Sequence, residues 1–191
     1  MGTDTVAAAM EAVHRRGFLR RLDRLRAAYD GPIHIGHGQT NSQPRTVADM
    51  LRLLEVRPGD SILDVGSGSG WTTALLAHLT GPDGRVIGVE RVPELVDVGA
   101  ENLDRAGMPW ARILSAEPGT LGAPEHAPYE RILVSAQPTG DMPPQLVGQL
   151  AAGGRMVIPV RGRLLLVTRT ESGYAASEHG WYRFVPLVTE D

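Results

Sequence analysis

The sequence predicts an α/β protein with a mostly parallel sheet, flanking helices and an antiparallel C-terminal strand. Short runs of Val, Ile and Leu alternate with helical patterns from residue 61 onward, and this alternation is typical of a parallel sheet wrapped by helices. The last two apolar runs have no helix between them, so we expect them to pair antiparallel. A length of 191 residues suits one domain.

The composition excludes several function classes. The chain has no cysteine, which excludes disulfides, cysteine-ligated zinc, iron–sulfur clusters and thiol catalysis. Its six histidines lack metal-ligand spacing, so no metal site is expected. A formal net charge of −3 gives no electrostatic reason to expect nucleic acid or an anionic membrane as a partner. No apolar run approaches the roughly 20 residues that span a bilayer, and we expect a cytoplasmic monomer.

The first 60 residues predict two helices separated by a loop. Over residues 5–29, three apolar residues recur on one face and three arginines on another: Phe18, Leu22 and Leu25, and Arg16, Arg20 and Arg24. The arginine row is compatible with an acidic partner, but a solvated helix face is the preferred interpretation. Residues 33–44 predict a loop by composition, and residues 45–56 predict a second helix.

The rest of the chain supplies the sheet and its crossovers. Strands are expected at 61–65, 85–90, 111–114, 131–136, 155–160, 163–170 and 183–188, and helices at 71–79, 93–106 and 145–150. Pro93 suits the first turn of its helix because the missing N–H would have no partner there.

The most informative motif lies between the first of these strands and its helix. It reads Asp64-x-Gly66-x-Gly68-x-Gly70. Glycines allow the backbone to turn sharply and to approach a ligand closely, and the following helix directs its N–H groups at that ligand. Glu90 ends the next strand, where a carboxylate can accept hydrogen bonds from ribose hydroxyls.

Two cofactor classes use such a loop, and the spacing favours one of them. Dinucleotide enzymes have Gly-x-Gly-x-x-Gly with a pyrophosphate on the helix, whereas here the glycines alternate and Asp64 would repel a pyrophosphate. The pattern resembles the first motif of the class I methyltransferases that use S-adenosylmethionine, whose ammonium group an acidic neighbour favours. A glycine turn with no ligand does not explain why Asp64, the loop and Glu90 occur together.

The polar loop indicates which methyltransferase family is concerned. The run Ile35-Gly-His-Gly-Gln-Thr-Asn-Ser-Gln-Pro44 resembles the characteristic loop of the protein-L-isoaspartate O-methyltransferases. Segments 91–95, 127–129, 153–160 and 184–187 resemble that family in the same order. The resemblance implies a single Rossmann-like domain over residues 1–191, with N-terminal helices and a covering loop in 1–57 and the Rossmann-like core in 58–191.

The resemblance also implies the site residues. Ser42 is the residue assigned to the active site, and Thr40, Ser42, His37 and Ser135 are expected at the substrate. The residues expected to bind S-adenosylmethionine are Gln39, Thr40, Asn41, Ser42, Asp64, Gly66, Ser67, Gly68, Gly70, Glu90, Arg91 and Glu117.

The chemistry agrees with a carboxylate substrate. A carboxyl group with a pKa near 4 is already an anion at neutral pH and needs no general base. It needs placement in line with the methyl group, with water excluded. Ser42 and Thr40 can orient a carboxylate without neutralising it, so we expect Ser42 to position the substrate rather than attack it.

Two departures from the family bear on specificity. Glu117, in Ala-Glu-Pro-Gly, stands where the family has an aspartate near the adenine, and Asn41 replaces an aliphatic residue.

The main prediction is S-adenosylmethionine-dependent methylation of L-isoaspartyl residues in peptides or proteins, followed by repair through a succinimide. The alternatives are an aspartyl O-methyltransferase dedicated to one partner peptide and a cofactor-binding module without turnover.

Overall fold

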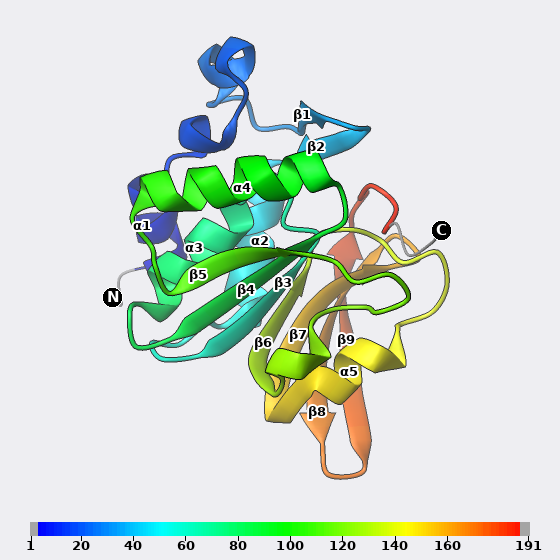
Figure 1. Cartoon of the computed structure of the whole chain (residues 1–191). Helices are drawn as coiled ribbons and strands as arrows, with labels where there is room; N and C mark the ends of the chain where they lie inside the picture. Colours follow the sequence, from blue (N-terminus) through cyan, green and yellow to red (C-terminus); the bar gives the residue numbers. More distant parts are fainter. Residues whose placement is uncertain (1–3, 188–191) are drawn as a thin grey trace.

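The computed structural model describes residues 4–187 and contains one seven-stranded sheet, in the order β5-β4-β3-β6-β7-β8-β9, with a separate β1–β2 hairpin (Figure 1). The strands are β1 Ile33–Gly36, β2 Gln39–Asn41, β3 Ser61–Val65, β4 Arg85–Glu90, β5 Ala111–Ser115, β6 Tyr129–Val134, β7 Leu150–Val160, β8 Arg163–Thr170 and β9 Gly173–Trp181. The helices are α1 Thr5–Ala12, α2 Pro44–Leu54, α3 Trp71–Thr80, α4 Pro93–Ala106 and α5 Pro144–Gln149, with 3-10 turns η1 Arg15–Phe18, η2 Arg21–Arg26 and η3 Pro124–His126.

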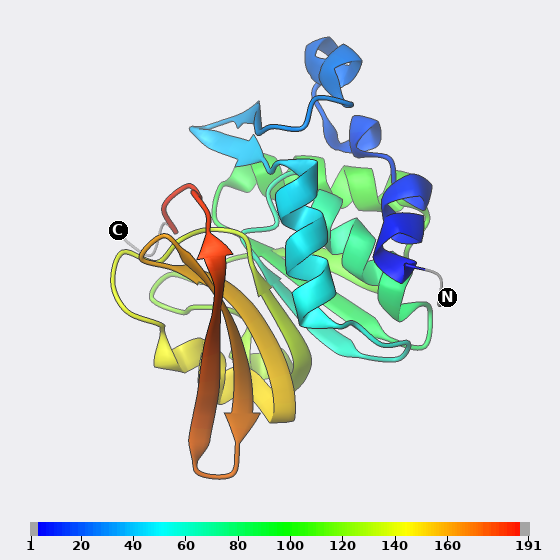
Figure 2. The ribbon, with the colours of Figure 1, turned by 180° about the vertical axis from the view of Figure 1, so that it is seen from behind.

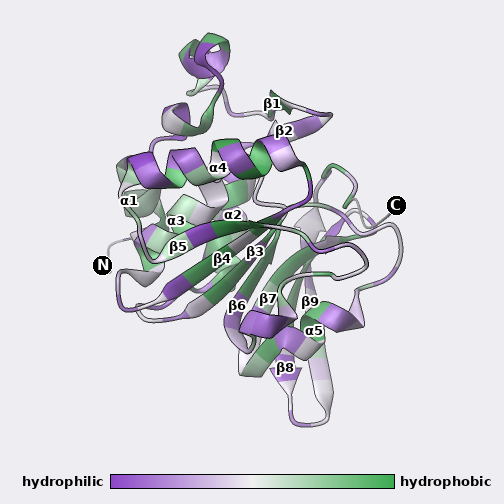
Figure 3. Cartoon of the chain, viewed as in Figure 1, coloured by the Kyte–Doolittle hydropathy of each residue, from purple (hydrophilic) through white to green (hydrophobic). Residues whose placement is uncertain are grey.

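The pairing confirms the predicted fold class. Strands β5, β4, β3, β6 and β7 pair parallel, and β7, β8 and β9 pair antiparallel. Successive residues of β3 face opposite sides of the sheet, as strand geometry requires: Ile62 belongs to the apolar cluster under α1, α2 and α3, and Leu63 to the cluster on the α5 side. The apolar side chains therefore form a core on each face. The central strands of the sheet are mostly in the hydrophobic colour in Figure 3.

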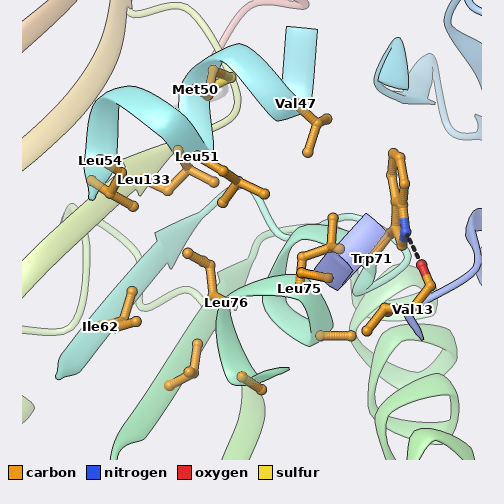
Figure 4. Packing of buried hydrophobic residues seen from close by; sticks show 14 of the residues in the cluster. Val13, Val47, Met50, Leu51, Leu54, Ile62, Trp71, Leu75, Leu76 and Leu133 are labelled. Atoms are coloured by element: carbon orange, nitrogen blue, oxygen red, sulfur yellow. Dashed lines mark hydrogen bonds between the residues drawn. The ribbon is translucent and has the colours of Figure 1, made fainter. Parts of the chain in front are cut away.

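The larger core holds the N-terminal helices on the sheet. Val47, Met50, Leu51 and Leu54 of α2 face Ile62 of β3 and the apolar side of α3 (Figure 4). Trp71 begins α3, and its indole Nε1 donates to the carbonyl of Val13 at 3.0 Å. Complete burial of a leucine contributes about 1.5 to 3 kcal/mol, so this face fixes α1 and α2, which flank the polar loop.

The C-terminal strand was predicted at the wrong place. The third antiparallel strand is β9, and residues 183–187 form no strand beyond a bridge between Pro186 and Gln137; residue 188 of the predicted strand lies outside the described residues. All residues of β9 are exposed. Its pairing comes from backbone hydrogen bonds to β8 (Figure 2), so the sequence carried no alternating apolar pattern to reveal it.

The N-terminal region also differs from the prediction. The helix expected over residues 5–29 is divided into α1, η1 and η2. Gly17 lies between α1 and η2, and a glycine inside a helix costs about 1 kcal/mol relative to alanine. Phe18 is buried, but Leu22 and Leu25 are exposed, so the expected continuous apolar face does not form.

The region predicted as a loop contains the β1–β2 hairpin. Ile33 pairs with Asn41 and His34 with Thr40. Gly36, His37 and Gly38 all have positive φ values, of 106°, 53° and 71°, so the turn requires the two glycines on either side of the histidine. The buried side chains of Ile33 and Ile35 fix this hairpin over the carboxyl edge of the sheet.

Candidate active site

A cavity of about 850 Å³ lies where β3, β4, β5 and β6 end, beneath the β1–β2 hairpin. Ligands of open parallel sheets bind at this carboxyl edge, and the volume is in the range of small-molecule sites. All but two of the residues predicted for the site line this cavity: His37, Gln39, Thr40, Asn41, Ser42, Gly66, Ser67, Gly68, Glu90, Arg91, Glu117 and Ser135. Asp64 and Gly70 do not line it.

The glycine loop forms one wall of the cavity. Gly66, Gly68 and Gly70 have φ values of 78°, 54° and 87°, in the left-handed region that favours glycine. The loop is held from behind, because the N–H groups of Gly66 and Ser67 donate to the carbonyl of Val89 at 2.9 and 3.1 Å. A side chain on Gly70 would meet the carbonyl of Gly99 in α4 at 3.0 Å, so the position of Gly70 serves helix packing.

Asp64 lies fully buried beneath this loop. Its Oδ2 accepts hydrogen bonds from the hydroxyls of Thr72 and Thr73, each at 2.7 Å, and its Oδ1 has no hydrogen-bond partner among residues 4–187. Burial raises the pKa of Asp64 to about 6, and the nearby charge of Glu90 acts in the same direction. When ionised, this carboxylate makes the electrostatic potential near the loop negative and favours a cationic ligand.

Glu90 is held at the edge of the cavity by backbone donors. The N–H of Gly68 donates to Oε2 at 2.8 Å, and the N–H groups of Arg91 and Val92 donate to Oε1 at 2.7 and 3.0 Å. These bonds fix the carboxylate, and each oxygen can accept further bonds. Glu90 is therefore placed to accept hydroxyl donors from a sugar.

The β1–β2 hairpin and Ser42, which follows it directly, are attached to the glycine loop through a buried pair, Arg15 and Asn41. Arg15 donates from Nε to Oδ1 of Asn41 at 2.7 Å, and Nδ2 of Asn41 donates to Oγ of Ser69 at 3.2 Å. Nη2 of Arg15 donates to the backbone carbonyl of Ser42 at 2.9 Å. Sequence analysis did not find Arg15 or Ser69 as site residues, because no pattern in one sequence separates Arg15 from its exposed arginine neighbours.

Three further predicted residues contribute polar side chains to the cavity. Ser67 and Ser135 are two of them, and neither buried hydroxyl has a hydrogen-bond partner in the described part of the chain. Glu117 lines the cavity on the segment after β5. A cavity that holds unpartnered buried hydroxyls fits a polar ligand, because a ligand can supply the missing hydrogen bonds.

The described residues contain neither a metal-binding cluster nor a membrane-spanning helix. Between residues 4 and 187, no three His, Asp or Glu side chains are grouped as a metal site would require. In the same range, no helix is both long and apolar enough to cross a bilayer.

The fold and this site together define a class I methyltransferase. The defining features are the left-handed glycine loop after β3, the acidic residue beneath it and the carboxylate that ends β4, and this class takes S-adenosylmethionine at that edge of the sheet.

Comparison with known proteins identifies the family. The model of the protein-L-isoaspartate(D-aspartate) O-methyltransferase family matches residues 1–191. A protein-L-isoaspartate O-methyltransferase of Methanopyrus kandleri is 47% identical over 99% of this chain and 85% of its own length, and one of Aeropyrum pernix is 44% identical over 97% of this chain and 73% of its own. The chain belongs to the protein-L-isoaspartate(D-aspartate) O-methyltransferase family, which confirms the predicted resemblance.

A solved structure supports the same assignment. A Plasmodium falciparum protein described as a protein-L-isoaspartate O-methyltransferase, in complex with S-adenosyl-L-homocysteine, superposes with a TM-score of 0.87 at 28% identity. The alignment covers 100% of this chain and 93% of that one. The bound molecule there is the product that S-adenosylmethionine becomes after it gives up its methyl group.

Proposed function

We propose that this chain transfers a methyl group from S-adenosylmethionine to the carboxylate of an L-isoaspartyl residue in a peptide or protein. The observation that carries the proposal is the juxtaposition of the Ser42 hairpin and the glycine loop on one cavity. The family match and the names of the relatives support the substrate class.

The residues at the cavity fit this methyl donor. Glu90 would accept hydrogen bonds from the ribose hydroxyls, and Glu117 would lie toward the adenine. Gly66, Ser67 and Gly68 would contact the methionine portion, whose ammonium group the charge of Asp64 favours. When bound, S-adenosylmethionine supplies an electrophilic methyl group on a positively charged sulfur.

The substrate side of the cavity needs to orient an anion rather than to generate one. The isoaspartyl carboxylate is ionised at neutral pH, and the hydroxyls of Ser42 and Thr40 can donate to one of its oxygens while the other faces the methyl carbon. His37 and Ser135 also line the cavity. One carboxylate oxygen bonds to the methyl carbon as the carbon–sulfur bond breaks, and the bonding pair stays on sulfur.

The product ester accounts for repair. A methyl ester is attacked by the following backbone nitrogen, which expels methanol and closes a succinimide. Water then opens the ring at either carbonyl, and part of the product is normal aspartate. No protein group needs to act after the ester has formed.

A pair of peptides tests the proposal. Matched peptides that contain isoaspartate or aspartate at one position are incubated with S-adenosylmethionine labelled in its methyl group. Label in the isoaspartyl peptide alone is expected. Equal label in both peptides, or none in either, contradicts the repair proposal. Tight binding of S-adenosylhomocysteine without transfer to either peptide would favour a cofactor-binding module.

One observation keeps the dedicated aspartyl methyltransferase as a second candidate. Both residues that depart from the family pattern, Glu117 and Asn41, line the cavity wall. A changed wall can restrict which peptides enter. Label in an aspartyl residue of one partner polypeptide, with none in unrelated isoaspartyl peptides, would support this candidate.

A further inference from the structure

An unusual surface lies on η2, away from the methyl-transfer cavity. A 3-10 helix has three residues per turn, so side chains three apart share a face. Leu22 and Leu25 form one such row and are 92% and 90% exposed. Arg21 and Arg24 form the adjacent row.

The third row, which starts at Arg20 just before η2, is also basic. It contains Arg20, Asp23 and Arg26, and both arginines pair with the aspartate, at 3.1 and 3.7 Å. The exposed leucines are thus flanked by arginines on both sides. Isolated exposed leucines are ordinary, but two in one row between cationic rows form a defined amphipathic ridge.

A second cavity adjoins this ridge. It has a volume of about 540 Å³, and its lining includes Arg16, Arg24, Arg105 and His14 but no carboxylate. Within residues 4–187, the side chains of Arg16 and Arg21 form no hydrogen bond or ion pair, and Arg24 donates only to the carbonyl of Leu19. The guanidinium groups are therefore available to an anionic partner.

The charge distribution sets this segment apart from the rest of the chain. The protein has 19 arginine residues, no lysine and a formal net charge of −3. Six of these basic residues lie between positions 15 and 26, where Asp23 is the one acidic residue. An acidic protein that concentrates cations on one short segment presents a local attraction for acidic partners.

The segment is connected to the active site but is separate from it. Residues 15–26 stand beyond α4, on the same side of the molecule as the β1–β2 hairpin (Figures 1 and 2). The two cavities share no lining residue. Arg15 of the same segment binds the backbone of Asn41 and Ser42, so a polypeptide that docks on η2 would lie next to the hairpin that covers the site.

We propose that the η2 ridge and its adjoining cavity dock an acidic, leucine-containing stretch of the polypeptide substrate, outside the residue that is methylated. Acidic side chains would pair with Arg16, Arg21 and Arg24, and apolar side chains would cover Leu22 and Leu25. This inference rests on the proposed peptide substrate and adds a second point of contact that selects among substrates.

A second copy of this chain is a poorer occupant of the ridge. A twofold interface places the same surface on both partners, so the arginine rows of one copy would face those of the other. Like charges placed opposite each other oppose association. An acidic polypeptide avoids this repulsion.

Peptide extensions test the proposal. The substrates share a short neutral core containing isoaspartate, either alone or extended on one side by a stretch of glutamate and leucine, or by the same stretch with glutamine in place of glutamate. Extensions on the N-terminal and C-terminal sides are compared. The acidic extension on one side is expected to lower KM by about tenfold with kcat unchanged, which corresponds to about 1.4 kcal/mol.

Surface variants locate the effect. L22S/L25S and R16Q/R21Q are expected to abolish the gain and to leave the kinetics of the unextended peptide unchanged. The matched controls Y174S and R57Q, which change an exposed aromatic residue and an exposed arginine elsewhere, should retain it. Thermal unfolding of all variants should match that of the parent protein, because the altered side chains are exposed.

The outcomes separate this proposal from the enzymatic one. Equal KM values for extended and unextended peptides, or a gain that survives in both surface variants, overturns docking on η2. Sedimentation equilibrium provides a further test. If the parent protein is a dimer and the L22S/L25S variant is a monomer, docking is also overturned, because a second copy of the chain would then cover the ridge. Direct binding of a labelled extension peptide without isoaspartate is measured in parallel. No methylation of any peptide, with this binding intact, would reject the proposed function and retain the docking surface.

Discussion

The guanidinium of Arg15 is buried against the side chain of Asn41, to which its Nε donates a hydrogen bond of 2.7 Å. Its remaining bonds go to backbone carbonyls, those of Tyr29, Gly31, Asn41 and Ser42. Burial lowers the pKa of Arg15 to about 10, so the side chain stays charged at neutral pH. A planar fork of donors is required to reach acceptors in several directions, and lysine lacks it.

Replacement of this side chain should therefore disturb the Ser42 hairpin. R15K is expected to lower the free energy of unfolding by about 2 kcal/mol, because several buried carbonyls lose their donor. It should also lower kcat/KM for an isoaspartyl peptide by about tenfold or more through misplacement of Ser42. Urea denaturation and peptide kinetics measure the two effects. R16K, an exposed neighbour, is the control, and equal behaviour of R15K and R16K would contradict this role.

The hydroxyl of Ser42 is predicted to orient the substrate. S42A should lower kcat by about 100-fold, the scale of the loss when a reacting group is misplaced. Affinity for S-adenosylhomocysteine should change far less, because the glycine loop and Glu90 remain. Steady-state kinetics and calorimetry separate these effects. S69A, which alters the hydroxyl next to Asn41, should show a smaller loss, and an S42A enzyme with unchanged kcat would contradict the positioning role.

Glu90 is predicted to bind the sugar of the methyl donor. E90Q keeps the size and one oxygen of the side chain but loses the charge that strengthens its hydrogen bonds. Affinity for S-adenosylhomocysteine should fall by about tenfold, or about 1.4 kcal/mol, which is close to the lower end of the range for hydrogen bonds to charged groups. Calorimetry measures the affinity, and D83N, at an exposed acidic residue, should leave it unchanged. Equal affinity of E90Q and the parent protein would remove Glu90 from the binding site.

The core of the fold was predictable because local signals agreed with tertiary packing. The bounds of α4 were predicted as observed, from Pro93 at its first position to Gly107 after its last, since both residues are typical helix boundaries. Strand β9 gave no such signal, because all its residues are exposed and its position depends on β8. Residues 15–26 were misassigned because a 3-10 helix changes the period from 3.6 to 3.0 residues.

The lining of the cavity was predictable to the extent that its residues follow strands or belong to the characteristic loop. Gly66, Ser67, Glu90 and Ser135 come at or just after the ends of parallel strands, which meet at one edge. The role of Arg15 depends on contacts with residues 14 to 27 positions away, which no local pattern encodes. Asp64 was predicted to bind the cofactor, but it lies under the loop rather than in the cavity wall.

The buried position of Asp64 predicts a pH-dependent stability. Its pKa in the folded protein is about 6, above its ordinary value of 3.8, so the folded state binds the proton more tightly than the unfolded state does. The stabilising contribution is complete below about pH 4 and is lost as pH rises through about 6. At neutral pH the ionised form should destabilise the protein that lacks the methyl donor by about 2 to 3 kcal/mol.

Comparison with D64N isolates this effect from other titrating groups. The free energy of unfolding of D64N, relative to that of the parent protein, should increase between about pH 4 and pH 7 by a similar 2 to 3 kcal/mol. Denaturant titrations at several pH values measure it, and D83N should show no such trend. Saturation with S-adenosylmethionine should reduce the difference, because its cationic groups favour the ionised carboxylate that D64N lacks. A difference that stays constant with pH would mean that Asp64 has an ordinary pKa and does not make the loop selective for a cation.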